Sequence, residues 1–304
     1  MLETIVQRAL VALTALLVSS AAVFALINSA VDPATAIAGA DASAESVEII
    51  RRNLGLDQSL VVQYVQWLGR AFLGDFGLSY RVNRPVGELV MQSFVITLTL
   101  GASALLLGGV LGIGLGVTAA LRRGSFHDRA VLLFSTIGQA VPAFWLALML
   151  VVVFSVNLRW LPVSGYGTIA HAVLPVAVLC LITIPPVIRL SRSAMIEVME
   201  SDYIRAARAK GLGITYIVLH HALRNALGPV LSLSAVQLGV LLSGSVAIET
   251  VFSINGIGFL AWQSVQRADI PVIQAIVFLL SVIYLALIVV GDLVNSALDP
   301  RTRR

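Results

Sequence analysis

Residues that commonly carry out chemistry are few in this chain, and they do not form a set. His220 and His221 are adjacent, so on a helix their side chains point about 100° apart and cannot easily share a metal ion. Lys210 is the only lysine, and it does not follow the spacing of a phosphate-binding loop. No serine stands in a nucleophile elbow. The sequence therefore predicts no catalytic residue, no metal site and no cofactor held by this chain.

One short polar segment has the features of a contact with another protein. It reads Asp202-Tyr-Ile-Arg-Ala-Ala-Arg-Ala-Lys-Gly211 and lies within the stretch 189–225. Ser201 or Asp202 can cap a helix start, the alanines favour a helix, and Gly211 suits its left-handed end. The pattern predicts a helix of about nine residues, roughly 13 Å long.

Such a helix would present small alanines flanked by cations. It could enter a groove on another protein, where the cations would meet carboxylates on the rim. The residues assigned to this contact are Asp202, Tyr203, Arg205, Ala206, Ala207, Arg208, Lys210 and Gly211. An amphipathic connector lying on lipid headgroups is the alternative.

The composition indicates what kind of molecule positions this segment. Hydrophobic residues make up 58% of the 304 residues and charged residues only 12%, against about 25% charged in a soluble domain. The mean hydropathy is +0.95. The net charge of +4 comes from cations in short loops between apolar runs, which favours a membrane protein and argues against a nucleic-acid partner. The single cysteine, Cys180, lies in such a run and is interpreted as a small buried apolar residue.

Six apolar runs are long enough to cross a bilayer as helices, and none contains Asp, Glu, Lys or Arg. They are 9–31, 93–121, 130–158, 160–188 (its helix expected to start near Ile169), 225–248 and 270–291. The predicted fold is therefore an all-α membrane protein with six transmembrane helices surrounded by lipid. Run 9–31 could be confused with a signal peptide, but its 23 residues exceed the usual apolar core of about 7–15, so we expect a retained anchor.

Glycines and prolines should shape these helices. Small residues in run 93–121 predict close helix packing. They are Gly108, Gly109, Gly112, Gly114 and Gly116. Prolines predict kinks, because they remove a hydrogen bond and crowd the preceding turn. They are Pro142, Pro175, Pro185, Pro186 and Pro229.

The charges in the loops predict the orientation. With the N-terminus in the cytoplasm, thirteen Arg and Lys residues lie inside, whereas the two short outside loops hold only Arg159 and Arg267. The positive-inside rule therefore predicts that both termini are cytoplasmic. Segment 32–92 would hold five Arg and seven acidic residues outside, but long exported segments escape the rule.

Segment 32–92 is too long for a simple turn. Apolar residues recur at helical spacing from Ser46 to Phe72, and Gly55 with Asp57 should break this stretch into two helices. The segment would cap the bundle or dock an exported partner.

The predicted division of the chain follows from these segments. Residues 1–92 would form the first span with an extracytoplasmic helical segment. Residues 93–304 would form a five-helix core with the cytoplasmic loop 189–225 and a short cytoplasmic tail.

The string 202–212 resembles the signature loop of the permease subunits of ATP-binding-cassette (ABC) importers. The motif of that family is Glu-Ala-Ala, three residues and then Gly. Ala206, Ala207 and Gly211 match it in register, whereas Arg205 stands where the general motif has Glu.

The departure at this position resembles the dipeptide, oligopeptide and nickel branch of the family. Pro229, which lies late after the motif, resembles the same branch. So do the stretches 249–258 and 298–301. The similarity covers most of the chain.

The resemblance implies a type I importer fold in a bacterial inner membrane. A second, related permease subunit would complete the path, two cytoplasmic ABC ATPases would bind ATP and Mg²⁺, and an extracytoplasmic binding protein would deliver a peptide. The short cytoplasmic helix would insert into an ATPase groove. Dipeptides, longer peptides, glutathione and nickel chelates stay open as cargo.

The implied path should be polar, because polar residues within spans tend to face the bundle interior or a watery cavity. The candidates are Ser135, Gln139, Gln237, Ser243, Ser245 and Glu249. Ordinary hydrogen bonds between helices are the alternative for the serines and glutamines. Glu249, near the outer end of its run, could attract a peptide amino group or contact the binding protein.

Two other classes of function have less support. An ion-driven secondary transporter should show internal repeats and charged or broken-helix sites at the midplane, and neither is evident. A membrane enzyme would need a nucleophile with its base, or a set of metal ligands.

Overall fold

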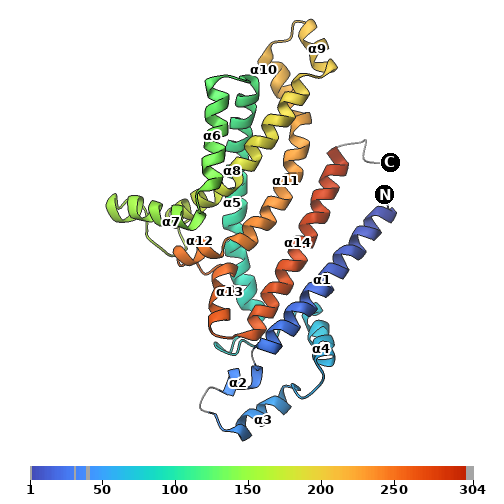
Figure 1. Ribbon diagram of the computed structural model, residues 1–304, viewed down its shortest axis with the longest axis vertical. Coiled ribbons are helices and arrows are strands. Elements are labelled where there is room, and N and C mark those ends of the chain that lie inside the picture. Colours follow the sequence, from blue (N-terminus) through green and yellow to red (C-terminus); the bar gives the residue numbers. More distant parts are fainter. Residues whose placement is uncertain (1, 31, 39–41, 299–304) are drawn as a thin grey trace. The chain divides into compact units, whose positions relative to one another are not determined.

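The computed structural model describes residues 2–30, 32–38 and 42–298, and every regular element in these ranges is a helix (Figure 1). The only β interaction described is one isolated bridge between Leu78 and Pro85. The chain forms two compact units. The first contains 98–254 with 286–298, and the second contains 2–97 with 255–285. The predicted all-α fold is confirmed.

Helix α8 (Ile169–Met199) forms the core of the first unit. It packs against α6 (Phe126–Ala140), α7 (Ala143–Leu150), α11 (Leu223–Gly244) and α12 (Val246–Val251). Thirteen of its residues are buried, although three prolines lie inside it. The run predicted over 160–188 is thus helical from Ile169, the start expected for it, and the helix continues to Met199.

Helix α5 (Val86–Leu121) approaches α8 along a line of small residues. A Cβ added at Gly108 would lie 3.1 Å from Thr183, and one at Gly112 would lie 2.8 Å from Val187. The predicted close packing is therefore confirmed for these positions and for Gly116, which faces Ser191. The other two glycines of the predicted set have nothing within 4 Å of an added Cβ.

The run 130–158 was predicted as one span with a kink at Pro142, and the chain does bend there, but the bend separates two helices. Helix α6 ends at Ala140, Val141 is extended with φ −80° and ψ 123°, and α7 begins after Pro142. A residue before proline is pushed out of the helical region, so the chain turns here. The two helical pieces meet at 97°.

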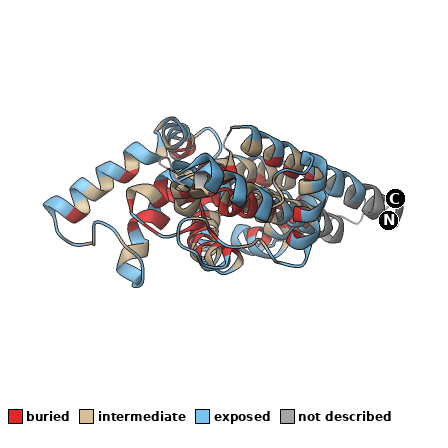
Figure 2. Ribbon diagram, turned by 90° about the horizontal axis from the view of Figure 1, so that it is seen from below, coloured by how far each residue is buried: buried red, intermediate tan, exposed pale blue. Residues whose placement is uncertain are grey.

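Helix α7 continues into a π-helix, η1 (Val151–Asn157). Both are mostly exposed in this chain, and their buried residues are Ala147 and Ser155 (Figure 2). Exposed apolar side chains on such a segment are suited to lipid or to another subunit.

Within the residues that the structure describes, four helical stretches are long and apolar enough to cross a membrane, and the bent pair would make a fifth. The four are Val86–Leu121, Ile169–Met199, Ile214–Ser243 and Ile270–Gly291. Helix α1 (Leu2–Ala30) contains a shorter apolar stretch, Leu13–Ser29. The predicted count of six is therefore not confirmed.

The second unit contains the segment that follows α1. The predicted break is confirmed, because α3 (Ala44–Asn53) and α4 (Leu60–Phe72) are separated by a turn with Gly55 at φ +65°. The short helix α2 (Pro33–Ala38) was not predicted.

Aromatic packing holds α4 in this unit. Tyr64 and Trp67 on α4 contact Phe24 on α1, with ring centroids 5.5 and 5.7 Å away. Trp67 also meets Phe278 of α14 (Ile270–Leu298) edge-on at 5.8 Å. Such pairs add about 0.5–1.5 kcal/mol each beyond the area they bury.

Candidate functional site

Helix α9 (Asp202–Ala209) is the short helix that the sequence predicted in the cytoplasmic loop. Ser201 has the extended backbone of a cap residue, but its hydroxyl donates to the Val198 carbonyl instead of accepting from the helix. At the other end, Gly211 has φ +79°, a left-handed conformation that favours glycine. Figure 1 shows α9 beyond the end of α8.

One face of α9 is anchored to its own chain. Ile204 is fully buried and Ala207 is 8% exposed. They pack in a cluster with Met195 of α8 and with Ile217 and Ala222 of the π-helix η2 (Ile217–Ala222). Ala207 was assigned to the contact with another protein, and in this chain its side chain lies in the cluster.

The opposite face of α9 is open. The exposed side chains are Asp202, Tyr203, Arg205, Ala206, Arg208, Ala209 and Lys210. Arg205 pairs with Asp202 one turn earlier. Asn225 at the start of α11 donates its Nδ2–H to the Tyr203 hydroxyl at 2.7 Å, so the helix is also tied at its edge. The small residues on the open face are thus Ala206 and Ala209.

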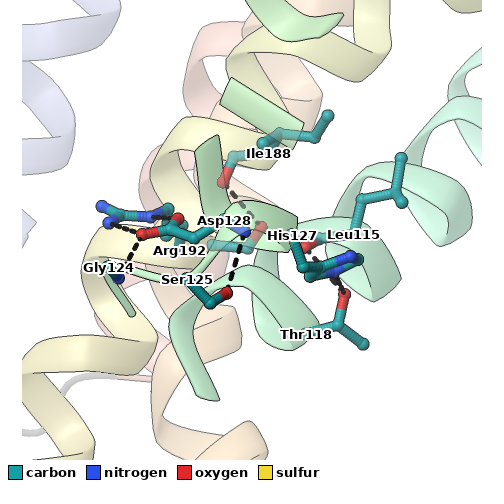
Figure 3. A network of polar contacts seen from close by, with 9 residues as sticks. Leu115, Thr118, Gly124, Ser125, His127, Asp128, Ile188 and Arg192 are labelled. Carbon is teal, nitrogen blue, oxygen red and sulfur yellow. Dashed lines mark hydrogen bonds and ion pairs between the residues drawn. The ribbon is translucent and has the colours of Figure 1, made fainter. Parts of the chain in front are cut away.

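Two ion pairs support the region behind α9. Arg123, between α5 and α6, pairs with Glu200 at the end of α8 at 2.8 Å, and both side chains are exposed. The second pair joins Asp128 of α6 to Arg192 of α8 (Figure 3). Its two bonds are Nε to Oδ1 at 2.6 Å and Nη2 to Oδ2 at 2.8 Å.

Asp128 is further fixed by the turn before α6. The Gly124 N–H donates to Oδ2 at 2.9 Å, and the Ser125 hydroxyl accepts from the Asp128 N–H at 3.3 Å (Figure 3). The Asp128 side chain is only 4% exposed. This ion pair was not predicted from the sequence. Its only signal was an Asp three residues after a Ser at a helix start, which marks a cap but names no distant partner.

Two predicted path residues meet at one cation. Arg189 of α8 donates Nη1–H to the Gln139 side-chain oxygen at 2.8 Å and to the Ser135 hydroxyl at 3.3 Å. Ser135 is buried and donates to the Pro185 carbonyl at 3.2 Å, whereas Arg189 and Gln139 are exposed. Arg189 was assigned to the cytoplasmic loop by sequence, and its contact with the polar residues of α6 was not foreseen.

The remaining path candidates do not converge in the same way. Gln237 is 8% exposed and its Nε2 has no hydrogen-bond partner among the described residues. Ser243 is exposed and donates to its own helix at Gly239. Ser245 is buried and donates to Glu249 at 2.8 Å. Glu249 is fully buried in the first unit, so it does not face an exterior ligand in this structure.

Comparison with known families agrees with this geometry. Residues 112–304 match the family described as the binding-protein-dependent transport system inner membrane component, and residues 1–101 match its N-terminal family. The chain belongs to this family, and it is a permease subunit of an ABC importer.

Relatives match over nearly the whole chain. A Brucella abortus (strain 2308) protein named as a peptide transport system permease is 40% identical over 280 residues, covering 90% of this chain and 89% of that protein. The glutathione transport system permease protein GsiC of Escherichia coli K12 is 37% identical over 304 residues, covering 100% of this chain and 99% of its own length.

A solved structure has a similar fold. A chain of the MetNI methionine ABC transporter in an inward-facing conformation aligns with a TM-score of 0.57 at 20% identity. The alignment covers 69% of this chain and 96% of that one. This likeness supports the fold alone.

Proposed function

We propose that this chain forms half of a translocation path for short peptides, and that α9 couples the path to ATP hydrolysis by partner subunits. Two relatives are named for peptide and for glutathione transport, and glutathione is itself a tripeptide. A glutathione permease is the second candidate, because that relative aligns over the full chain. A nickel-chelate permease stays a weaker alternative, since no observation favours it.

The proposed assembly has four kinds of partner. A second, related permease subunit would complete the path, and two cytoplasmic ABC ATPases would bind ATP and Mg²⁺. An extracytoplasmic binding protein would deliver the peptide to the outer side. In this arrangement both termini lie in the cytoplasm, residues 1–92 form the first span with an outer segment, and 93–304 form the core.

The observation that carries the coupling proposal is the asymmetry of α9. Its inner face is fixed by Ile204 and Ala207, so the helix is held rigidly by α8 and η2. Its outer face exposes Ala206 between the cations Arg205 and Arg208. A small residue between cations allows close backbone approach to a partner groove while the guanidinium groups reach carboxylates on its rim.

The path proposal centres on Arg189, an exposed cation that donates to the exposed Gln139 and to the buried Ser135 near the bend between α6 and α7. A cation within an apolar helix is costly unless it serves a polar cavity, so this point is suited to line the path. Gln237, whose Nε2 has no hydrogen-bond partner among the described residues, is the second group that a polar path would satisfy. Ser243, Ser245 and Glu249 are kept as weaker candidates.

The test places a bulky residue on the exposed face of α9 and compares the variant with substitutions at two control positions. Ala206→Trp should block docking, because an indole cannot fit where a methyl group approaches a groove. We expect a loss of at least about 30-fold in ATP-driven peptide uptake by proteoliposomes, as for a central interface residue worth about 2 kcal/mol or more. ATPase subunits should no longer copurify with the tagged chain.

Two controls separate coupling from folding. Ser193→Trp, at an exposed position of α8 away from α9, should leave uptake within about twofold of wild type. Ala207→Trp should instead lower the yield of folded chain, because that position is buried. Normal uptake and copurification by the Ala206→Trp variant would refute the coupling role of α9.

A further inference from the structure

Helix α4 lies in the segment that the sequence places outside the membrane, yet it packs against the middle of an apolar helix. The Tyr64 hydroxyl lies 2.9 Å from the Ser20 hydroxyl and donates to the Leu17 carbonyl at 3.2 Å. Both partners belong to the apolar stretch Leu13–Ser29 of α1. Figure 1 shows α4 beside the second half of α1. Helix α4 therefore contacts the part of α1 that would cross the bilayer.

The depth of α4 follows from the rise of a helix along its axis. At 1.5 Å per residue, Ser20 and Phe24 lie about 14 and 8 Å from Ser29, where the apolar stretch of α1 ends. Phe278, whose ring meets an α4 ring edge-on at 5.8 Å, lies about 12 Å from Ile270, where the span of α14 begins. The hydrocarbon core of a bilayer is about 30 Å thick. The contacts of α4 with both spans therefore lie at the level of the acyl chains.

Two faces of α4 are accounted for by their surroundings in the second unit. One face packs on α1 and α14 in a cluster with Phe24 and Phe278. Its residues are Tyr64, Trp67 and Ala71. The other face is polar and lines a cavity of about 710 Å³. Its residues are Gln63, Gln66 and Arg70. Polar groups beside acyl chains are costly, so a water-filled cavity is the setting that suits this face.

The third face of α4 is an exposed apolar stripe formed by Val61, Val65 and Phe72. Each of the three side chains is more than half exposed. At about 100° per residue, the three positions fall within about 40° of one another, roughly opposite the polar face. Leu73, just after the helix, is 87% exposed and adds to the stripe. A stripe of this kind in water would favour association, whereas in hydrocarbon it has a suitable solvent.

Depth and chemistry together select acyl chains as the partner of the stripe. Helix α1 exposes Val18 and Leu26 within its own apolar stretch, so both helices offer the same kind of surface. The side chains of the stripe carry no charge and no hydrogen-bonding group. A soluble exported protein would have to pass the headgroups to reach this level.

We propose that α4 is embedded in the outer leaflet, where its stripe contacts lipid acyl chains and its polar face borders an aqueous cavity. The helix thus separates lipid from water beside α1 and α14, and the segment after α1 re-enters the membrane. The lipid contact follows from depth alone. The choice of the outer leaflet rests on the proposed orientation, with the N-terminus in the cytoplasm.

The experiment places a nitroxide spin label at single cysteines in the complete importer complex in nanodiscs, with Cys180 replaced by alanine. Power saturation compares oxygen, which concentrates among acyl chains, with chromium oxalate, which stays in water. Val65→Cys should keep access to oxygen and lose access to chromium oxalate. Gln66→Cys on the polar face and Leu54→Cys in the turn before α4 are the matched controls. Both should stay accessible to chromium oxalate.

Two results at Val65 would overturn the proposal. Access to chromium oxalate equal to that at Leu54 would mean that α4 lies in water. Loss of access to both reagents would mean that another protein subunit covers the stripe. A second pair of variants does not depend on the label. Val65→Asp should lower the yield of folded chain in membranes at least about threefold relative to Gln66→Asp, because a carboxylate is costly among acyl chains. Equal yields would also overturn the lipid contact.

The leaflet is tested separately from the lipid contact. A membrane-impermeant maleimide added to intact cells should label Leu54→Cys and should not label Glu197→Cys, and both positions are exposed. The reverse pattern would overturn the outer leaflet together with the proposed orientation, while the spin-label result would still decide whether α4 contacts lipid.

Discussion

The contact between α5 and α8 gives the sharpest quantitative prediction, through the substitution Gly112→Ala. The new Cβ would lie 2.8 Å from both Cβ and Cγ1 of Val187 and 3.2 Å from the Ile184 carbonyl oxygen. Ordinary van der Waals contact begins near 3.4 Å, so the helices must separate locally by about 0.6 Å. Val187 is fully buried and branched at Cβ, so it cannot swing away.

The expected magnitude follows from two opposing terms. Overpacking a close contact costs about 1–3 kcal/mol. Replacing glycine by alanine inside a helix returns up to about 1 kcal/mol. We therefore expect a net loss of about 1–2 kcal/mol for Gly112→Ala. Gly109→Ala is the matched control in the same helix, because nothing lies within 4 Å of its added Cβ. It should be neutral or slightly stabilising.

The chain contains its own probe for this measurement. Cys180 is the single cysteine, it is 7% exposed, and its Sγ–H donates to the Ala104 carbonyl of α5 at 3.5 Å. Labelling by a membrane-permeant maleimide requires the interface to open, so a loss of 1–2 kcal/mol should speed labelling by about 5–30-fold. If Gly112→Ala and Gly109→Ala label at the same rate, the close contact is not a determinant of packing.

Two further predictions concern polar contacts. Asp128→Asn should destabilise the first unit by about 2–4 kcal/mol, measured by thermal unfolding. This loss is below the range for a fully buried pair, because the Arg192 side chain is 21% exposed. Replacing both residues by leucine should restore part of the lost stability. Asp269→Ala removes the acceptor of the Ser79 hydroxyl and of the Tyr80 backbone N–H. Trypsin should then cleave after the nearby Arg81 about tenfold faster. An unchanged cleavage rate would show that the Asp269 carboxylate does not hold the turn around Ser79.

The sequence was sufficient where local chemistry decides the structure. Helix α9 was predicted because a cap residue, alanines and Gly211 act within one short stretch. The break between α3 and α4 was predicted from Gly55 for the same reason. The close approach of α5 and α8 was predicted from the glycines, because small residues have few other uses in an apolar helix.

The sequence was insufficient where partners lie far apart in the chain. Nothing local shows that Arg192 reaches Asp128, 64 residues away, or that Arg189 reaches Gln139, 50 residues away. Composition also predicted one apolar span over 130–158, because it does not report whether Pro142 kinks a helix or ends it. Backbone satisfaction by neighbouring helices decides between these results.

The faces of α9 on which Ala206 and Ala207 lie decide which substitution tests contact with a partner. Ala206 and Ala207 are adjacent and chemically identical, and both match the family motif. On a helix they point about 100° apart, and the cluster of Met195 and Ile217 selects Ala207 for burial. A bulky residue at Ala207 would therefore test folding, whereas the same residue at Ala206 tests contact with a partner.

The contacts of α8 indicate which helices would move if a partner displaced α9. The cluster beneath α9 includes Met195 of α8 and contacts Val117 and Ala120 of α5. The Asp128–Arg192 pair joins the same stretch of α8 to α6. Packed interfaces resist small deformations, so movement of α9 should carry these three helices together as one body.

If α5, α6 and α8 move as one body, the distance between α5 and α8 should not change when ATP binds. Spin labels at Leu121 on α5 and Glu197 on α8, in a chain with Cys180 replaced by alanine, would report it by electron–electron double resonance in the assembled importer. Both positions are exposed. The distance should stay constant within about 2 Å between nucleotide-free and ATP-bound states, the size of ordinary helix shifts. A change near one helical turn, about 5 Å, would mean that α8 slides along α5 and that α9 acts through a different element.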